Sequence, residues 1–215
     1  MTARDFKKST IREYFESIVI AVILALFIRT FVVQAFKIPT GSMEENLLIG
    51  DHLLVNKFIF APTASHLEQA LLPVASIKRG DVIVFKYPED PERDFIKRVI
   101  GLPGETVEVR EKKVYVNGQA LDEPYAHYLL PVSTPSEFHE VTSFDVRERY
   151  GPVTVPADQY FVMGDNRDNS QDSRYWGFMP RDYVKGKALF VYFSYGETPE
   201  GSTSVRWARI LHQIH

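Results

Sequence analysis

The pattern of apolar residues changes once along the chain, near Pro39. Before it, an apolar run extends from Ser17 to Ile28 and resumes after Arg29, and no polar face recurs at helical spacing within the run. After it, the helical period disappears, and short apolar runs alternate with turns rich in Pro and Gly. The sequence therefore predicts one N-terminal helix followed by a mainly β domain of several short antiparallel strands.

Turn residues divide the β region into predicted strands. Asn117-Gly118 predicts a tight turn after a hairpin whose arms are 106–109 and 113–116. The stretch 124–156 is rich in Pro, Ser, Glu and Arg, and we expect an irregular insertion on the main sheet there. The other expected strands are 52–60, 81–86, 95–102, 160–163 and 187–193.

The N-terminal helical segment predicts a transmembrane helix. Taken from Tyr14 to Phe36, it would be roughly 34 Å long, against a bilayer core of about 30 Å. The span requires Glu16 at one headgroup layer and Arg29 extended toward the other. Residues 1–13 are basic, which predicts a cytoplasmic N-terminus and places residues 37–215 outside the membrane as an extracytoplasmic domain.

Two other interpretations of this segment remain open at this point. Val33-Gln34-Ala35 has the small-residue character of a signal-peptide cleavage site, so the segment could be a cleaved secretory signal. The segment could also be an amphipathic helix packed on a soluble core. The lack of a recurring polar face argues against this second interpretation.

Composition narrows the classes of function. The chain has 215 residues, a hydrophobic fraction of 45% and a net charge of -3, which suits one sizeable domain with a small appendage. Nothing in the overall charge predicts nucleic-acid binding, which needs a basic patch or stripe. Because the chain has no Cys, a Cys nucleophile, disulfides and thiolate metal sites are excluded.

The first candidate for chemistry is Ser42, in the run IPTGSM directly after the helical segment. Behind Pro39, and between Gly41 and the bulky Met43, this serine suits a sharp, exposed turn. Gly41 would let a substrate backbone approach closely. Taken alone, the pattern is more typical of an ordinary loop hydroxyl than of a nucleophile.

The second candidate is Lys97, in one of the predicted strands. Because side chains alternate between the faces of a strand, Phe95, Lys97 and Val99 share one face. An edge-strand lysine facing water is the ordinary interpretation. A buried lysine would instead be neutral at working pH and could take a proton from a serine hydroxyl.

The third candidate is the polar run 164–177 (GDNRDNSQDSRYWG). It resembles a calcium-binding loop in composition, but counting from Asp168 the sixth position is Ser173 and the twelfth is Met179, where Gly and Glu are needed. The sequence therefore predicts no metal site here. So many donors and acceptors directly after a strand favour a hydrogen-bonded network that holds a site rigid.

Together these three runs resemble the bacterial type I signal peptidases, also called leader peptidases. The matching motifs are IPTGSM at 38–43, Lys97-Arg98-Val99 followed by GLPG at 101–104, and Gly164-Asp165-Asn166 running to Asp172-Ser173-Arg174. The resemblance implies a serine endopeptidase with a Ser–Lys dyad, without metal or cofactor. It also implies an enzyme in the bacterial plasma membrane that removes signal peptides from exported preproteins after small residues, of the Ala-x-Ala type.

The resemblance also implies a role for each matching residue. Ser42 would be the nucleophile and Lys97 the general base. Thr40 would supply a hydroxyl to the oxyanion hole, together with the Ser42 backbone N–H, and Ser170 would orient the Lys97 amine. The structural support of the site would come from Asp165, Asn166, Asp172 and Arg174. The walls of two shallow pockets for substrate side chains would be Phe36, Ile38, Met43, Leu47, Phe95 and Ile96.

Two features depart from the family pattern. Family members often carry Pro-Thr-Leu after the nucleophile, where this chain has Glu45-Asn46-Leu47, so the shape of this loop is open. Some members have two membrane segments, and this sequence predicts one. The alternatives are a soluble, self-cleaving Ser–Lys protease of the repressor type and an anchored envelope protein without enzyme activity.

Overall fold

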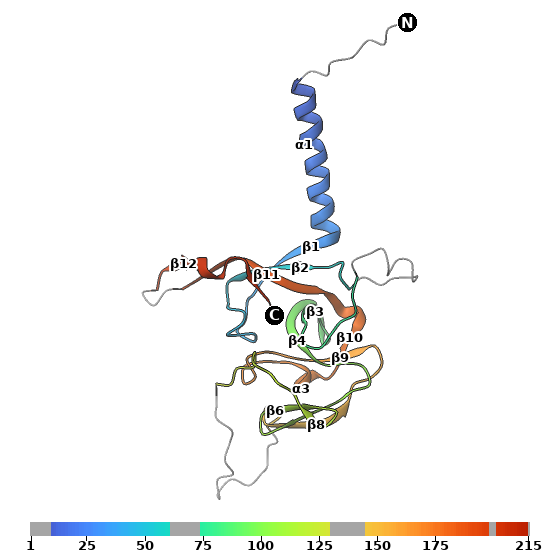
Figure 1. Ribbon diagram of the computed structural model, residues 1–215. Coiled ribbons are helices and arrows are strands. Elements are labelled where there is room, and N and C mark those ends of the chain that lie inside the picture. Colours follow the sequence, from blue (N-terminus) through green and yellow to red (C-terminus); the bar gives the residue numbers. More distant parts are fainter. Residues whose placement is uncertain (1–9, 61–73, 130–144, 198–200, 215) are drawn as a thin grey trace, which may run out of the picture.

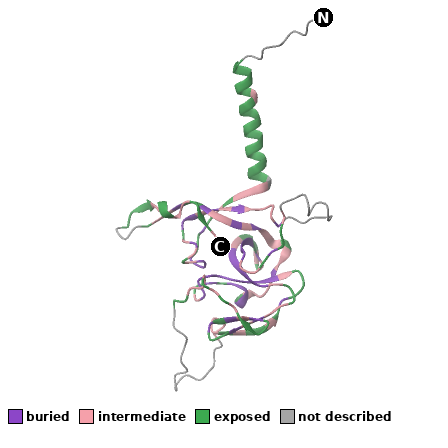
Figure 2. Ribbon diagram, in the orientation of Figure 1, coloured by how far each residue is buried: buried purple, intermediate pink, exposed green. Residues whose placement is uncertain are grey.

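The protein is described by a computed structural model, which covers residues 10–60, 74–129, 145–197 and 201–214. Helix α1 (Thr10–Phe27) extends away from the β domain and continues into a π-helical turn, η1 (Ile28–Val32). No residue of α1 is buried, as Figure 2 shows. None of the helices in these described ranges combines the length and the apolar character that crossing a membrane requires. The basic residues 1–9, part of the predicted cytoplasmic segment, lie outside the described residues.

The helix ends earlier than the sequence predicts. We expected it to continue to Phe36, whereas strand β1 (Val33–Lys37) begins directly after η1. β1 pairs antiparallel with β2 (Asp51–Asn56), with Val33 opposite Asn56 and Lys37 opposite His52. The hydrogen bonds of this ladder favour extended backbone over helix, because without β1 the backbone groups along that side of β2 would lack partners.

Within the described residues, the main sheet has nine strands. Lys97 lies on one of these strands, and Ser42 lies in a loop between two others. The strand order is β1-β2-β11-β3-β4-β9-β10, and all of these neighbours pair antiparallel. β12 and β13 pair with β11 beside this path. The remaining bounds are β3 (Val82–Tyr87), β4 (Asp90–Gly101), β9 (Gln159–Met163), β10 (Met179–Pro180), β11 (Val184–Glu197), β12 (Thr203–Val205) and β13 (His212–Gln213).

A smaller sheet of four strands, in the order β7-β6-β5-β8, lies at the far end of the molecule from α1 (Figure 1). The predicted hairpin is confirmed: β5 (Thr106–Arg110) pairs with β6 (Lys113–Val116). Asn117 and Gly118 both have positive φ, 52° and 78°, and turn the chain into β7 (Gln119–Ala120).

The stretch 124–156 is not wholly irregular, as the sequence led us to expect. β8 (Arg149–Thr154) lies within it and pairs with β5, although residues 130–144 lie outside the described residues. Gly151-Pro152 interrupts the alternation of residues in β8, so the periodicity of the sequence does not reveal this strand. Three short helices complete the described fold: α3 (Ser173–Trp176), η2 (Arg181–Tyr183) and η3 (Trp207–Arg209).

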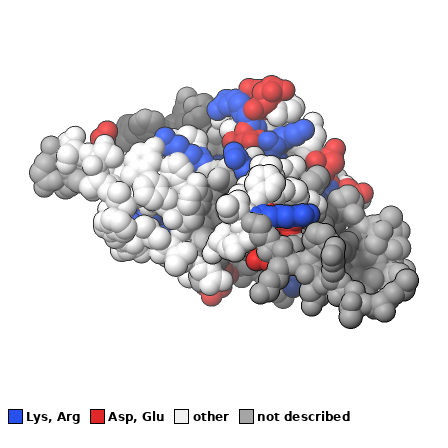
Figure 3. Space-filling model, turned by 90° about the horizontal axis from the view of Figure 1, so that it is seen from above, with Lys and Arg blue, Asp and Glu red and all other residues white. Residues whose placement is uncertain are grey.

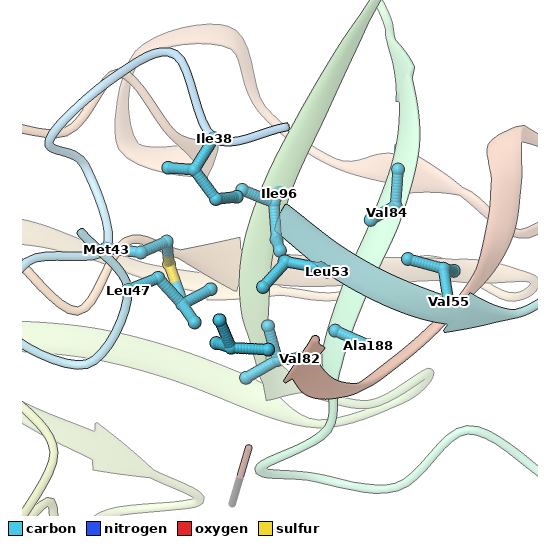
Figure 4. Close-up of a cluster of buried hydrophobic side chains, with 10 residues drawn as sticks. Ile38, Met43, Leu47, Leu53, Val55, Val82, Val84, Ile96 and Ala188 are labelled. Atoms are coloured by element: carbon cyan, nitrogen blue, oxygen red, sulfur yellow. The ribbon is translucent and has the colours of Figure 1, made fainter. Parts of the chain in front are cut away.

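Buried apolar side chains form three clusters, of which the first positions the candidate site. This first cluster, drawn in Figure 4, joins Ile38, Met43 and Leu47 from the loop between β1 and β2 to residues of the main sheet. The second cluster contains Phe60, Phe85 and Val99. Burying one Met or Leu side chain contributes about 1.5–3 kcal/mol, so the loop is anchored by its own apolar residues.

Candidate active site

Ser42 lies in the loop 38–50 that joins β1 to β2. The loop contains no strand, and local turns shape it: the Glu44 N–H donates to the Gly41 carbonyl at 3.2 Å, and the Leu47 N–H donates to the Met43 carbonyl at 2.8 Å. Met43 and Leu47 are buried on either side of these turns. Ser42 itself is only 7% exposed. The apolar anchors therefore hold a serine that is nearly covered.

Lys97 lies in the interior of the main sheet, since β4 has β3 on one side and β9 on the other. It pairs with Ile83 of β3 and is 3% exposed. The position excludes the edge-strand interpretation. Its Nζ lies 5.2 Å from the centre of the Phe95 ring, so the two side chains share a face of the strand, as alternation predicted.

The structure brings Ser42 and Lys97 into direct contact. Lys97 Nζ lies 2.7 Å from Ser42 Oγ, within hydrogen-bond distance, and 3.0 Å from the Ile96 carbonyl oxygen. Burial lowers the pKa of Lys97 to about 8, against an opposing effect of the negative charges on Asp172 and Asp165. A neutral lysine amine can accept a proton from a serine hydroxyl, and this amine is neutral in part near pH 8.

The segment between β9 and α3 packs on the backbone of the nucleophile. The Asn166 N–H donates to the Ser42 carbonyl at 3.2 Å, and Asn166 Nδ2 donates to the Gly41 carbonyl at 3.2 Å. Gly164 is close enough that a Cβ there would overlap both the Ser42 carbonyl oxygen and Ser170 Oγ. Sequence reasoning included Gly164 in the motif but missed this role, for which a glycine directly after a buried strand was the available signal.

The structure gives less direct support to the predicted roles of Thr40 and Ser170. Thr40 is exposed, two residues before Ser42. Ser170 is 7% exposed, and its side chain interacts with Asp172, whose pKa it helps to lower. No hydrogen bond joins Ser170 Oγ to Lys97 Nζ, and Ser170 adjoins the site through Gly164.

Asp172 and Arg174 form a buried ion pair in this segment. Arg174 Nη2 lies 2.8 Å from Asp172 Oδ2, and Arg174 Nη2 also donates to the Arg167 carbonyl at 2.7 Å. Burial alone would raise the pKa of Asp172, but Arg174 and the Gly164 N–H hold it below its usual range. Asp172 is therefore charged at neutral pH and adds to the field at Lys97.

Two further buried arginines were not predicted as site residues. Arg98 binds Asp165 through Nη2 at 2.6 Å and Nε at 2.8 Å, and Arg167 binds Glu123 through Nη2 at 2.6 Å. Both arginines belong to the sequence motifs, where Arg98 follows Lys97 and Arg167 follows Asn166. Their position beside predicted site residues was the signal that could have identified them. Breaking such a pair by removing one partner leaves an uncompensated buried charge.

The unusual Asn46 connects the nucleophile loop to one of these pairs. Asn46 Nδ2 donates to Asp165 Oδ2 at 2.8 Å and to the Tyr125 carbonyl at 3.0 Å. The Arg98 guanidinium lies 4.0 Å from the centre of the Tyr125 ring. The loop shape that the sequence left open is thus fixed by a hydrogen-bonded asparagine.

The family follows from comparison with known proteins. Residues 11–193 match the family model described as "Signal peptidase, peptidase S26". The chain belongs to the bacterial type I signal peptidases. Signal peptidase I of Pseudomonas aeruginosa is 36% identical, over 95% of this chain and 80% of that protein. "Probable signal peptidase I-2" of Synechocystis sp. is 42% identical, over 86% of this chain and 74% of that protein. "Signal peptidase I P" of Bacillus subtilis subsp. natto is 37% identical, over 88% of this chain and 92% of that protein.

Membership in this family makes the chain a serine endopeptidase. It therefore excludes the two alternative functions, a soluble self-cleaving protease of the repressor type and an envelope protein without enzyme activity. The mainly β architecture is confirmed as well. In the described ranges, no group of three or more acidic or histidine side chains is arranged to hold a metal ion.

The residues predicted as pocket walls of this signal peptidase do not all lie together. Five of them belong to the first cluster or pack against it, whereas Phe95 packs against the second cluster. A groove of about 750 Å³ lies beside the nucleophile loop, between Lys37, Glu44 and Tyr195, and Ile38 is the predicted wall residue that lines it. The five residues in or against the first cluster are Phe36, Ile38, Met43, Leu47 and Ile96.

Proposed function

We propose that this signal peptidase removes N-terminal signal peptides from exported preproteins, after small residues of the Ala-x-Ala type, with Ser42 as nucleophile and Lys97 as general base. The observation that carries the proposal is the 2.7 Å distance between Ser42 Oγ and Lys97 Nζ. The burial of Lys97, which lowers its pKa to about 8, supports the same assignment. A Ser–Lys pair of this kind needs no histidine.

The proposed reaction has two halves. The neutral Lys97 amine takes the Ser42 hydroxyl proton while Ser42 Oγ bonds to the scissile carbonyl carbon. The resulting ammonium gives this proton to the leaving amine as the C–N bond breaks, which leaves an acyl ester on Ser42. The amine, neutral again, takes a proton from water as the water oxygen attacks the ester carbonyl. Ser42 Oγ leaves with that proton, and the signal peptide departs with a new carboxyl terminus.

The oxyanion would be bound by the Ser42 N–H and the Thr40 hydroxyl. Both Ser42 and Gly41 present their carbonyls to Asn166, which fixes the peptide groups around Ser42. Among the described residues no acceptor binds the Ser42 N–H, so this donor is available to substrate. Thr40 is exposed, and rotation of its side chain could bring a second donor to the same oxygen.

Ser170 would orient the Lys97 amine once substrate is bound. Its buried hydroxyl adjoins Gly164 beside the Ser42 carbonyl and interacts with Asp172, whose charge acts on Lys97. The apolar residues of the first cluster, with Phe95 next to Lys97, would form the walls that accept small side chains. Asp165, Asn166, Asp172 and Arg174 would hold this arrangement through the buried contacts described above.

We also propose that the N-terminal segment anchors the enzyme in the bacterial plasma membrane as a single span that ends before β1, with the N-terminus cytoplasmic and the β domain from Val33 extracytoplasmic. Exposed apolar side chains along α1, such as Ile18 and Leu24, support a lipid contact. Figure 3, a view from above, shows uncharged residues over one part of the visible face, with basic and acidic groups mixed along its upper edge and near its centre. An anchored enzyme would be held close to the end of the signal helix of its substrate.

The test is cleavage of a preprotein with an Ala-x-Ala site by the detergent-solubilised protein, with sequencing of the new N-terminus. Ser42→Ala should lower the rate by about 10⁴-fold or more, because the nucleophile is lost. Ser204→Ala, an exposed serine on β12, should leave the rate unchanged. Retention of more than a few per cent of activity by Ser42→Ala would contradict the assignment.

A further inference from the structure

The C-terminal segment 201–214 returns to the nucleophile loop. β12 pairs with the end of β11, β13 pairs with Phe190 and Val191, and η3 lies between them in the chain. The family match ends at residue 193, so the segment lies beyond the part of the chain that the family model describes. η3 brings Arg209 to the loop that carries Ser42.

Arg209 binds two points of this loop at once. Its Nη2 lies 2.6 Å from Asp51 Oδ2 and its Nε 3.0 Å from Asp51 Oδ1. Nη2 also donates to the Asn46 carbonyl at 2.8 Å. A guanidinium can serve a carboxylate and a carbonyl together because its donors lie in one planar fork.

Asp51 is itself fixed at the end of the loop. It is 0% exposed, accepts from the Leu48 N–H at 2.9 Å and accepts from Ser194 Oγ at 2.6 Å. Burial alone would raise its pKa, but the hydrogen bonds from Arg209, Ser194 and Leu48 keep the pKa below its usual value. The charged carboxylate therefore persists at neutral pH and holds Arg209.

Asn46 is thus held from two sides. Its side chain donates to Asp165, which belongs to the buried support of the site, and its carbonyl accepts from Arg209 of the C-terminal segment. The loop between Pro39 and Gly50 has no strand ladder of its own, so these side-chain contacts act together with its buried apolar anchors to fix its position. A displacement of about 1 Å at a reacting group can cost about a hundredfold in rate.

We propose that Arg209 is a positioning residue for cleavage, which fixes the loop from Asn46 to Asp51 and so keeps Ser42 Oγ in contact with Lys97 Nζ. The inference rests on the proposed function. Without Arg209 the loop can shift, Ser42 Oγ moves from Lys97, and water reaches the amine. Hydration of the amine favours its charged form, so its pKa rises.

The test compares Arg209→Ala with Arg181→Ala in the full-length, detergent-solubilised protein. Arg181 is a matched control, because its Nη2 donates to the Phe60 carbonyl at 2.7 Å but it makes no contact with the nucleophile loop. The measurements are kcat and KM on a preprotein-derived peptide, the pH profile of kcat/KM, and thermal unfolding. Arg209→Ala should lower kcat by about ten- to a hundredfold and move the acidic limb to higher pH, with KM within about threefold.

Arg209→Lys keeps a positive charge beside Asp51, so it preserves the fold if Arg209→Ala does not. Its single ammonium cannot reproduce the planar fork, and it should show a smaller change in kcat and in the acidic limb, in the same direction. If both variants match Arg181→Ala in kcat and in pH profile, the proposed role of Arg209 is overturned. Failure of the wild-type protein to cleave would instead overturn the proposed function, so the two failures are distinguishable.

Discussion

Lys97 and Ser42 meet at 2.7 Å but are held in place by different means. Lys97 lies on β4, whose backbone is hydrogen-bonded to β3 on one side and β9 on the other. Ser42 lies in a loop without strand pairing, fixed by buried apolar anchors and by side chains from distant segments. Lys97 is therefore positioned by the sheet, and Ser42 by buried apolar anchors and by hydrogen bonds from distant segments.

This difference separates two kinds of mutational effect. The ladder around Lys97 is part of the fold, so a change there acts on stability before it acts on the geometry of the amine. The Asn46 side chain gives the Ser42 loop two hydrogen bonds, and Arg209 makes four, three of them to the buried carboxylate of Asp51. An ordinary hydrogen bond contributes about 0.5–1.5 kcal/mol, and one to a charged group contributes about 1.5–3 kcal/mol. Loss of the Asn46 side chain should therefore leave the protein folded while it displaces Ser42, whereas loss of Arg209 also leaves Asp51 buried without its ion-pair partner and should lower stability as well.

The largest expected effect is at Lys97, where chemistry and burial coincide. Lys97→Arg should be as inactive as Lys97→Ala, with a loss of about 10⁴-fold or more in kcat/KM. Arg stays protonated in proteins and cannot accept the Ser42 proton. The measurement is peptide cleavage by both variants, with folding verified by circular dichroism. An active Lys97→Arg variant would show that the site needs only a positive charge, and the dyad would be excluded.

The next effect is on stability and tests the sheet side of the comparison. Arg98→Ala leaves Asp165 buried without its ion-pair partner, and it should lower the free energy of unfolding by about 3–5 kcal/mol. Arg110→Ala is the control, because its pair with Glu108 is exposed to solvent and should contribute little to stability. Denaturant unfolding of both variants gives the comparison. Equal losses would mean that the buried pair does not support the site.

Much of the sheet could be predicted because its signal is local. The apolar run at 52–60 predicts a strand, and β2 lies over its first part, with buried and half-buried residues alternating from Asp51 to Asn56. β8 could not be predicted, because Gly151-Pro152 breaks its pattern and its pairing with β5 is the evidence for the strand. The end of the N-terminal helix was misplaced for the same reason, since β1 exists through its pairing with β2.

The candidate site divides in the same way. Ser42, Lys97 and the segment 164–174 are each marked by a motif whose own residues lie close together in the sequence. The tethers of the loop join residues far apart in sequence: Asn46 and Asp165 are separated by 119 positions, and Asp51 and Arg209 by 158. No local pattern marks either partner, so these contacts required the folded chain.

Mutation of Ser170 tests whether the Lys97 amine needs a hydroxyl that contacts it only when substrate is bound. Ser170→Ala should lower kcat by about ten- to a thousandfold, less than loss of either dyad residue, because the amine loses a partner that fixes its direction. Ser173→Ala is the matched control, since Ser173 is also buried but its Oγ accepts from the Val162 N–H at 2.9 Å, away from the dyad. If both variants lose the same activity, Ser170 acts through packing alone.

The smallest expected effect is the response of the wild-type enzyme to pH. It tests the role of the buried Lys97 without any mutation. Burial lowers the pKa of Lys97 from 10.5 to about 8, and the neutral amine is the active form. Below that pKa the amine binds a proton, so kcat/KM should fall about tenfold for each unit of pH, and above it the rate should level off. An Ala-x-Ala peptide carries no titrating side chain, so the limb reports the free enzyme. His52, the nearest histidine in sequence to Ser42, packs among the rings of Tyr192, Phe193 and Tyr195 rather than at the dyad, and His52→Gln should leave the limb in place. A profile that is flat between pH 6 and 9, or a limb near about 6.5 that moves in His52→Gln, would count against a lysine base.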